Sequence, residues 1–105
     1  PRMINWNRVS ELKDEIGEED FAEVAEMFIA EVEEVIDRLR TAPDPAAYEA
    51  DLHFIKSSAL NLGFAELSGL CQHGERQAAA GDANGVDLAP VFASYAASKA
   101  AFLAG

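Results

Sequence analysis

A histidine, a lysine and two serines lie close together in the stretch HFIKSSALNLGF, which begins at His53. Histidine is a candidate nucleophile because its imidazole is largely uncharged near neutral pH. Lys56 follows one helical turn later, where its ammonium would offset negative charge arriving on the ring. The small side chains of Ser57 and Ser58 would leave the approach to the ring open. These residue types at this spacing are suited to holding a phosphoryl group on His53.

The predicted helix that carries this stretch, over residues 45–62, has two different faces. At about 100° per residue, its apolar residues gather on the side opposite His53, and these are Tyr48, Ile55, Ala59 and Leu62. The side chains that share the outward face with His53 are Glu49, Lys56, Ser57 and Leu60. Each alone would be ordinary solvated surface, but together they offer an acid, a cation, a hydroxyl and a leucine on which a partner protein could dock.

Helical spacing of apolar residues runs through almost the whole chain, and no strand pattern competes with it. The predicted helices span residues 5–16, 19–40, 45–62, 64–80 and 87–103. We expect Asp20 to cap the second helix and Asp44, before Pro45, to cap the third. Gly63 marks a bend and Asp87 can cap the fifth helix. The sequence therefore predicts an all-α fold: one domain over 1–105, an antiparallel up-down-up-down four-helix bundle with a short additional N-terminal helix.

The charge of the chain limits its partners. Its 105 residues include 8 Lys+Arg and 19 Asp+Glu, for a formal net charge of -11. Such a charge repels phosphate backbones and anionic lipids, which argues against nucleic acid and membranes as partners. No segment approaches the roughly 18 uninterrupted apolar residues of a membrane span, and no signal peptide is visible at the N-terminus. The single cysteine, Cys71, suits a reducing compartment, so we expect a cytoplasmic protein.

Other constellations of reactive residues carry less weight. Cys71, His73 and Glu75, with His53, are residue types that bind metals, but Cys71 lies on an apolar stripe and should face the core, while His73 points elsewhere. We expect no metal ligands. A serine hydrolase is not supported, since Ser57 stands beside His53 without a traceable acid or oxyanion arrangement. The acidic run formed by Glu31, Glu33, Glu34 and Asp37 is interpreted as a solvated face.

The stretch resembles the histidine-containing phosphotransfer (HPt) domain of multistep two-component phosphorelays. The family pattern is His-x-Leu-Lys-Gly-Ser and a small residue, with Gly ten positions after the histidine, often Cys eighteen after it, and an acid or amide four further on. The matching residues here are His53, Ile55, Lys56, Ser57, Ser58, Ala59, Gly63, Cys71 and Glu75. The resemblance covers nearly the whole chain and is most specific over residues 48–76.

Two residues depart from the family pattern. Ser57 replaces the usual glycine and adds a side chain where a partner would approach, which could slow or select docking. Gly74 stands where leucine is common. Because glycine costs about 0.8 to 1.0 kcal/mol relative to alanine in a helix interior, we expect it to loosen local packing.

The resemblance implies a relay between receiver domains of response regulators, and a hybrid histidine kinase can carry one of these receivers. His53 would be the phosphoacceptor and Lys56 would stabilise the transferring charge. Ser57, Ser58, Glu49, Leu60 and Glu75 would form the phosphoryl site and docking face. No glycine-rich phosphate loop is present, so we expect a phosphocarrier without kinase activity. No cofactor is expected in the chain, and Mg²⁺ would come from the receiver.

Two other interpretations stay open at this point. An HPt-like bundle could bind a receiver or kinase without carrying phosphate, although a pure adaptor needs neither His53 nor Lys56. A dimeric bundle, like the dimerisation domain of a histidine kinase, is a variant of the same idea. The length of the chain and its separate first helix favour a monomer.

Overall fold

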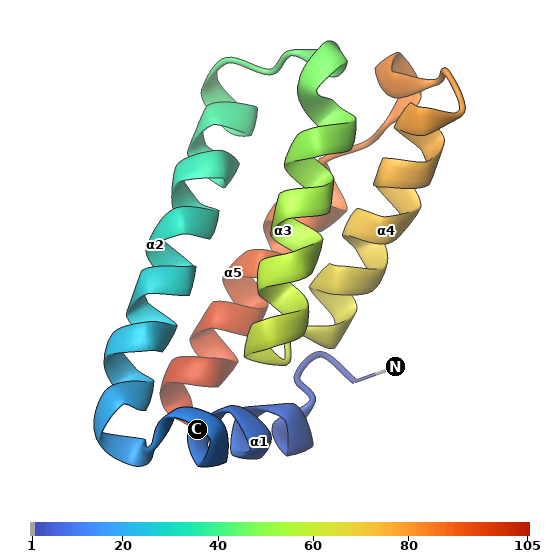
Figure 1. Cartoon of the computed structure of the whole chain (residues 1–105). Helices are drawn as coiled ribbons and strands as arrows, with labels where there is room; N and C mark the ends of the chain where they lie inside the picture. The colour runs from blue at the N-terminus through green and yellow to red at the C-terminus, as the bar shows by residue number, and fades with distance from the viewer. Residues whose placement is uncertain (1) are drawn as a thin grey trace.

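The computed structural model describes residues 2–105, and within them the chain is helical with no strand (Figure 1). The elements are α1 (Trp6–Ile16), α2 (Glu18–Thr41), a 3-10 turn (Pro45–Ala47), α3 (Tyr48–Leu62), α4 (Ala65–Ala79), a second 3-10 turn (Ala83–Gly85) and α5 (Ala89–Ala104). This confirms the predicted all-α class. None of the helices in the described part is long and apolar enough to cross a membrane.

Figure 1 shows α2, α3, α4 and α5 standing side by side, with the chain reversing direction from each to the next. The short α1 lies across one end of this group, near the C-terminus, and contacts α2 and α3. The largest fully buried side chains form one core, and they come from α2, α3, α4 and the turn between α3 and α4: Ile36, Leu39, Leu52, Ile55, Leu62, Phe64 and Leu67. Burial of these side chains is the main force that holds the helices together.

The α3–α4 connection depends on Gly63. This residue ends α3 with φ of +80°, a left-handed conformation that glycine adopts at little cost. A Cβ atom at Gly63 would also lie 2.7 Å from the carbonyl oxygen of Asn5. The backbone N–H of Asn5 donates to the Gly63 carbonyl at 2.6 Å. The Asn5 side chain caps α1 by accepting a hydrogen bond from Arg8 N–H. One glycine thus joins the tight turn to the start of α1.

Gly74 brings α3 and α4 together rather than loosening them, which corrects the expectation for this residue. It is buried on α4, and a Cβ atom there would lie 2.8 Å from the Leu52 Cδ1 atom on α3. Leu52 is itself fully buried, so it has little room to move. Leu52 fills the space that a side chain at Gly74 would occupy. Helices α3 and α4 therefore approach closely at the residue before Glu75.

Each helix starts within one to three residues of the prediction, and the expected caps differ at two helices. Helix α2 begins at Glu18 after Gly17, which leaves Asp20 inside the first turn instead of at the cap. There its charge favours the helix because the N-terminus carries partial positive charge. Asp44 does cap the next segment, accepting from Ala46 N–H at 3.1 Å, but residues Pro45–Ala47 form a 3-10 turn before α3. Asp87 accepts from Ala89 N–H at 3.0 Å at the start of α5.

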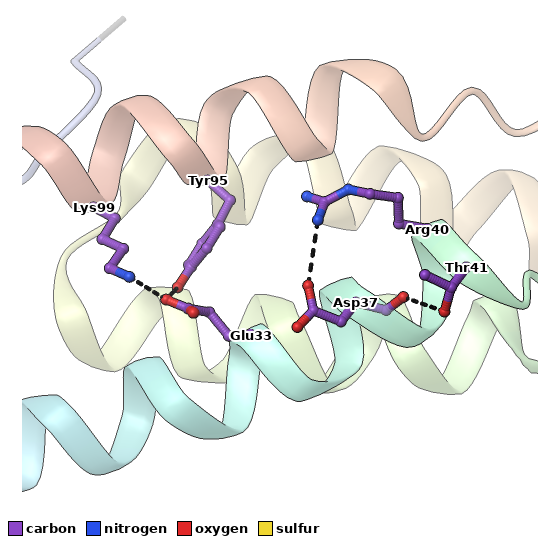
Figure 2. Close-up of polar contacts among 6 residues, drawn as sticks. All are labelled: Glu33, Asp37, Arg40, Thr41, Tyr95 and Lys99. Atoms are coloured by element: carbon purple, nitrogen blue, oxygen red, sulfur yellow. Dashed lines mark hydrogen bonds and ion pairs between the residues drawn. The ribbon is translucent and has the colours of Figure 1, made fainter.

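A polar cluster joins α2 to α5 (Figure 2). Glu33 accepts a hydrogen bond from the Tyr95 hydroxyl at 2.7 Å and pairs with the Lys99 ammonium through the same oxygen. Lys99 and then Tyr95 lower the pKa of Glu33, while burial and the contact with Glu33 raise the pKa of Tyr95. The interpretation of the acidic run as wholly solvated is therefore wrong for Glu33, whose carboxylate ties the two helices together.

Candidate functional site

Helix α3 projects His53 outward, as the helical wheel predicts. The side chain is 60% exposed, whereas Leu52 and Ile55 on the other side of the helix are fully buried. Anchoring by these two apolar residues fixes the rotation of α3 and so fixes the direction of the imidazole. The ring is held by the fold but remains open to an approaching molecule.

Glu75 on α4 connects two residues of the α3 face, His53 and Lys56. Its Oε2 atom lies 2.8 Å from His53 Nδ1, and its Oε1 atom lies 2.7 Å from Lys56 Nζ. The side chains of Glu75 and Lys56 are partly buried, at 19% and 20% exposure, which reduces screening by water. The sequence assigned Glu75 to the site only through the family resemblance, and the structure places it at the centre.

The charge on Glu75 determines which nitrogen of His53 is free. The ammonium of Lys56 first, and then the hydrogen bond from His53, lower the pKa of Glu75, although partial burial opposes them. An ionised carboxylate can only accept, so the Nδ1 atom beside it carries the proton. In the neutral ring the lone pair then lies on Nε2. The site presents Nε2 as its nucleophilic atom.

Ser57 and Ser58 occupy different environments. The exposed Ser57 donates its hydroxyl to the His53 carbonyl at 3.1 Å, so its oxygen is turned toward its own helix. Ser58 is only 4% exposed. This corrects the expectation that both serines border the imidazole: Ser58 is five residues after His53, about 140° around the helix, and faces the interior.

Leu60 continues the exposed face toward the end of α3. It is 56% exposed, and it borders a shallow depression shared with α1. Arg8 on α1 reaches this edge by donating to the Asn61 side chain at 3.4 Å, and it also pairs with Glu15 of its own helix at 3.2 Å. Sequence reasoning missed Arg8, because nothing in the local pattern shows that α1 lies against the end of α3.

Glu49 lies on the other side of His53, one turn earlier on α3. It is exposed, and it lines a shallow depression together with His53, Glu75 and two alanines, Ala46 and Ala50. The small alanine side chains keep this side of the imidazole open. Two carboxylates therefore border the ring, one paired with Lys56 and one without a cation among the described residues.

Cys71 and His73 do not join the site. Cys71 is fully buried, as its apolar stripe predicts, and burial first and Glu75 second raise the pKa of its thiol to about 12. His73 is exposed and borders a separate depression with α5 residues. Within residues 2–105, no group of three or more His, Cys, Asp or Glu side chains is arranged to hold a metal ion.

Comparison with known families agrees with this arrangement. The family model described as the Hpt domain matches residues 23–101, most of the chain and all of the α3–α4 site. The chain belongs to the Hpt domain family, whose role is histidine phosphotransfer in phosphorelays and whose members interact with receiver domains. Comparison with curated proteins and with solved structures gave no match.

Proposed function

We propose that His53 accepts a phosphoryl group from the aspartyl phosphate of one receiver domain and passes it to the aspartate of another. The Nε2 lone pair attacks phosphorus as the bond to the aspartate oxygen breaks, and the aspartate leaves as a carboxylate. The ring keeps its proton on Nδ1 and gains positive charge. Donation to the second receiver is the same exchange in reverse.

The observation that carries this proposal is the contact between Glu75 and His53 Nδ1 at 2.8 Å. It holds the ring in the tautomer that leaves Nε2 free, and it places a negative charge beside the ring where positive charge develops. Preorganised charge of this kind is among the largest contributions to catalysis because no reorganisation is needed during the reaction.

Lys56 and Leu60 support the same function in different ways. The Lys56 ammonium lies against Glu75 and keeps that carboxylate ionised, and it is close enough along the helix to attract phosphoryl oxygens. Leu60 offers an apolar contact for the receiver beside the phosphoacceptor. Ser57, with its hydroxyl turned inward, limits how closely the receiver backbone approaches.

On this proposal the chain carries the phosphoryl group and does not generate it. The sequence contains no glycine-rich phosphate loop, so the group comes from a phosphorylated receiver and not from ATP bound to the chain. The receiver would supply the Mg²⁺ that neutralises the transferring phosphoryl oxygens. We further propose that the chain acts as a monomer in the cytoplasm.

The decisive experiment is transfer from radiolabelled phosphoreceivers to the wild-type chain and to His53→Gln. We expect an acid-labile, base-stable label on the wild type and none on His53→Gln, with unchanged circular dichroism because the replaced side chain is exposed. His73→Gln, at the other exposed histidine, is the matched control and should retain the label. Label that persists in His53→Gln would place the phosphoacceptor elsewhere, and binding without label would favour the adaptor function.

A further inference from the structure

The charges around His53 do not balance. Lys56 is the cation of the α3 face, and it is paired with Glu75, so these two charges largely cancel. Glu49 has no cation partner among residues 2–105. Since it lies four positions before His53 on the same helix, their Cβ atoms are about 5–6 Å apart. Glu49 is therefore an uncompensated charge next to the phosphoacceptor.

Building on the proposed function, we propose that Glu49 destabilises the phosphorylated form of His53 and biases the site toward donating its phosphoryl group. The neutral imidazole has no net charge for Glu49 to repel. The phosphoryl oxygens bring about two negative charges, and the compensating positive charge of the ring remains at Nδ1, where it faces Glu75. Repulsion by Glu49 thus acts on the phosphorylated state and spares the free state.

The Cβ spacing gives the scale of the charge separation, and with it the scale of the effect. Two unit charges about 6 Å apart in water change an equilibrium constant by about threefold. Two phosphoryl charges would give about tenfold, which counterions reduce at ordinary ionic strength because the Debye length is only about 8 Å. We expect an effect of about fivefold at low salt and less than about twofold at 1 M salt, where the Debye length is about 3 Å.

The test is the equilibrium distribution of label between a phosphoreceiver and the chain, approached from both directions, in Glu49→Gln and wild type. The glutamine variant should shift the distribution toward phosphorylated His53 by about fivefold at low salt. Glu19→Gln is the matched control, because Glu19 is also an exposed acid in the first turn of a helix, on α2. It should leave the distribution unchanged. Glu49→Lys should move the distribution further in the same direction as Glu49→Gln.

The alternative role for Glu49 is contact with the docked receiver. The forward and reverse rates of phosphoryl transfer distinguish this role from electrostatic destabilisation of phosphorylated His53. A docking contact changes the forward and reverse rates by the same factor and leaves the equilibrium constant alone, and that result would overturn the inference. A shift that does not weaken with salt would also overturn it. If the wild type accepts no label at all, the proposed function and this inference fall together, whereas label with an unchanged distribution overturns only the role of Glu49.

Discussion

Two glutamates in this molecule have the same kind of partners and very different consequences. Glu75 joins α4 to α3 through an ion pair with a lysine ammonium and a hydrogen bond with an imidazole. Glu33 joins α2 to α5 through an ion pair with a lysine ammonium and a hydrogen bond from a phenol. In both cases the partners lower the pKa of the carboxyl group. The difference lies in the third group: the His53 side chain is 60% exposed, and Tyr95 is 6% exposed.

Exposure decides what each cluster can do. Burial and the contact with Glu33 keep Tyr95 protonated, so the phenol only holds the helices together. His53 receives the same support from a carboxylate but keeps one ring nitrogen open to solvent. On the proposed function, this exposed nitrogen is what makes the Glu75 cluster reactive, whereas the Glu33 cluster has no such exposed group.

The largest difference between the clusters should appear when each glutamate is neutralised. We expect Glu75→Gln to slow phosphoryl transfer to His53 by about ten- to hundredfold, because a hydrogen bond to a charged group contributes about 1.5–3 kcal/mol. Glu33→Gln should leave the rate unchanged. Initial rates from a phosphoreceiver measure both, and equal rates in Glu75→Gln and wild type would remove Glu75 from the mechanism.

The lysines provide a second comparison, with a smaller effect. Lys56→Ala should slow transfer by several-fold, because Glu75 loses its cation and the phosphoryl oxygens lose a nearby positive charge. Lys99→Ala removes the equivalent partner of Glu33 and should not change transfer. Both variants should remain folded, which thermal unfolding can verify. A Lys56→Ala variant that transfers at the wild-type rate would show that its ammonium is only structural.

Two glycines on α4 test how closely this helix packs against α3. Gly69 has open space around it, so Gly69→Ala should raise the free energy of unfolding by up to about 1 kcal/mol through helix propensity. Gly74→Ala gains the same propensity but meets Leu52, and overpacking costs about 1–3 kcal/mol, for a net loss of about 1 kcal/mol. Urea unfolding of both variants measures the difference, and stabilisation by Gly74→Ala would refute the close approach.

The smallest effect concerns acid stability. A carboxyl group with a lowered pKa in the folded state adds stability above its unfolded pKa, near 4.5, and loses it as the pH falls through the folded value. Glu33→Gln and Glu75→Gln should each reduce the loss of stability between pH 7 and pH 3, by less than about 1 kcal/mol for such partly exposed pairs. Urea unfolding at the two pH values checks this, and an unchanged loss in both variants would contradict it.

The sequence by itself determined the helices and the face of α3. Apolar residues spaced three and four apart predicted where helices form, and Gly63 predicted the turn between α3 and α4. The same spacing predicted that His53 points outward while Ile55 and Cys71 are buried. These predictions succeed because they depend on a single helix, where the backbone fixes the angle between side chains.

Contacts between helices were decided by the tertiary structure alone. Periodicity does not show how far one helix is shifted or rotated against its neighbour, so it could not place Glu33 against Tyr95 or Arg8 beside Asn61. Glu75 entered the site through family resemblance, and only packing showed that its two oxygens divide between His53 and Lys56. Packing likewise placed Leu52 in the space that a side chain at Gly74, the residue before Glu75, would occupy.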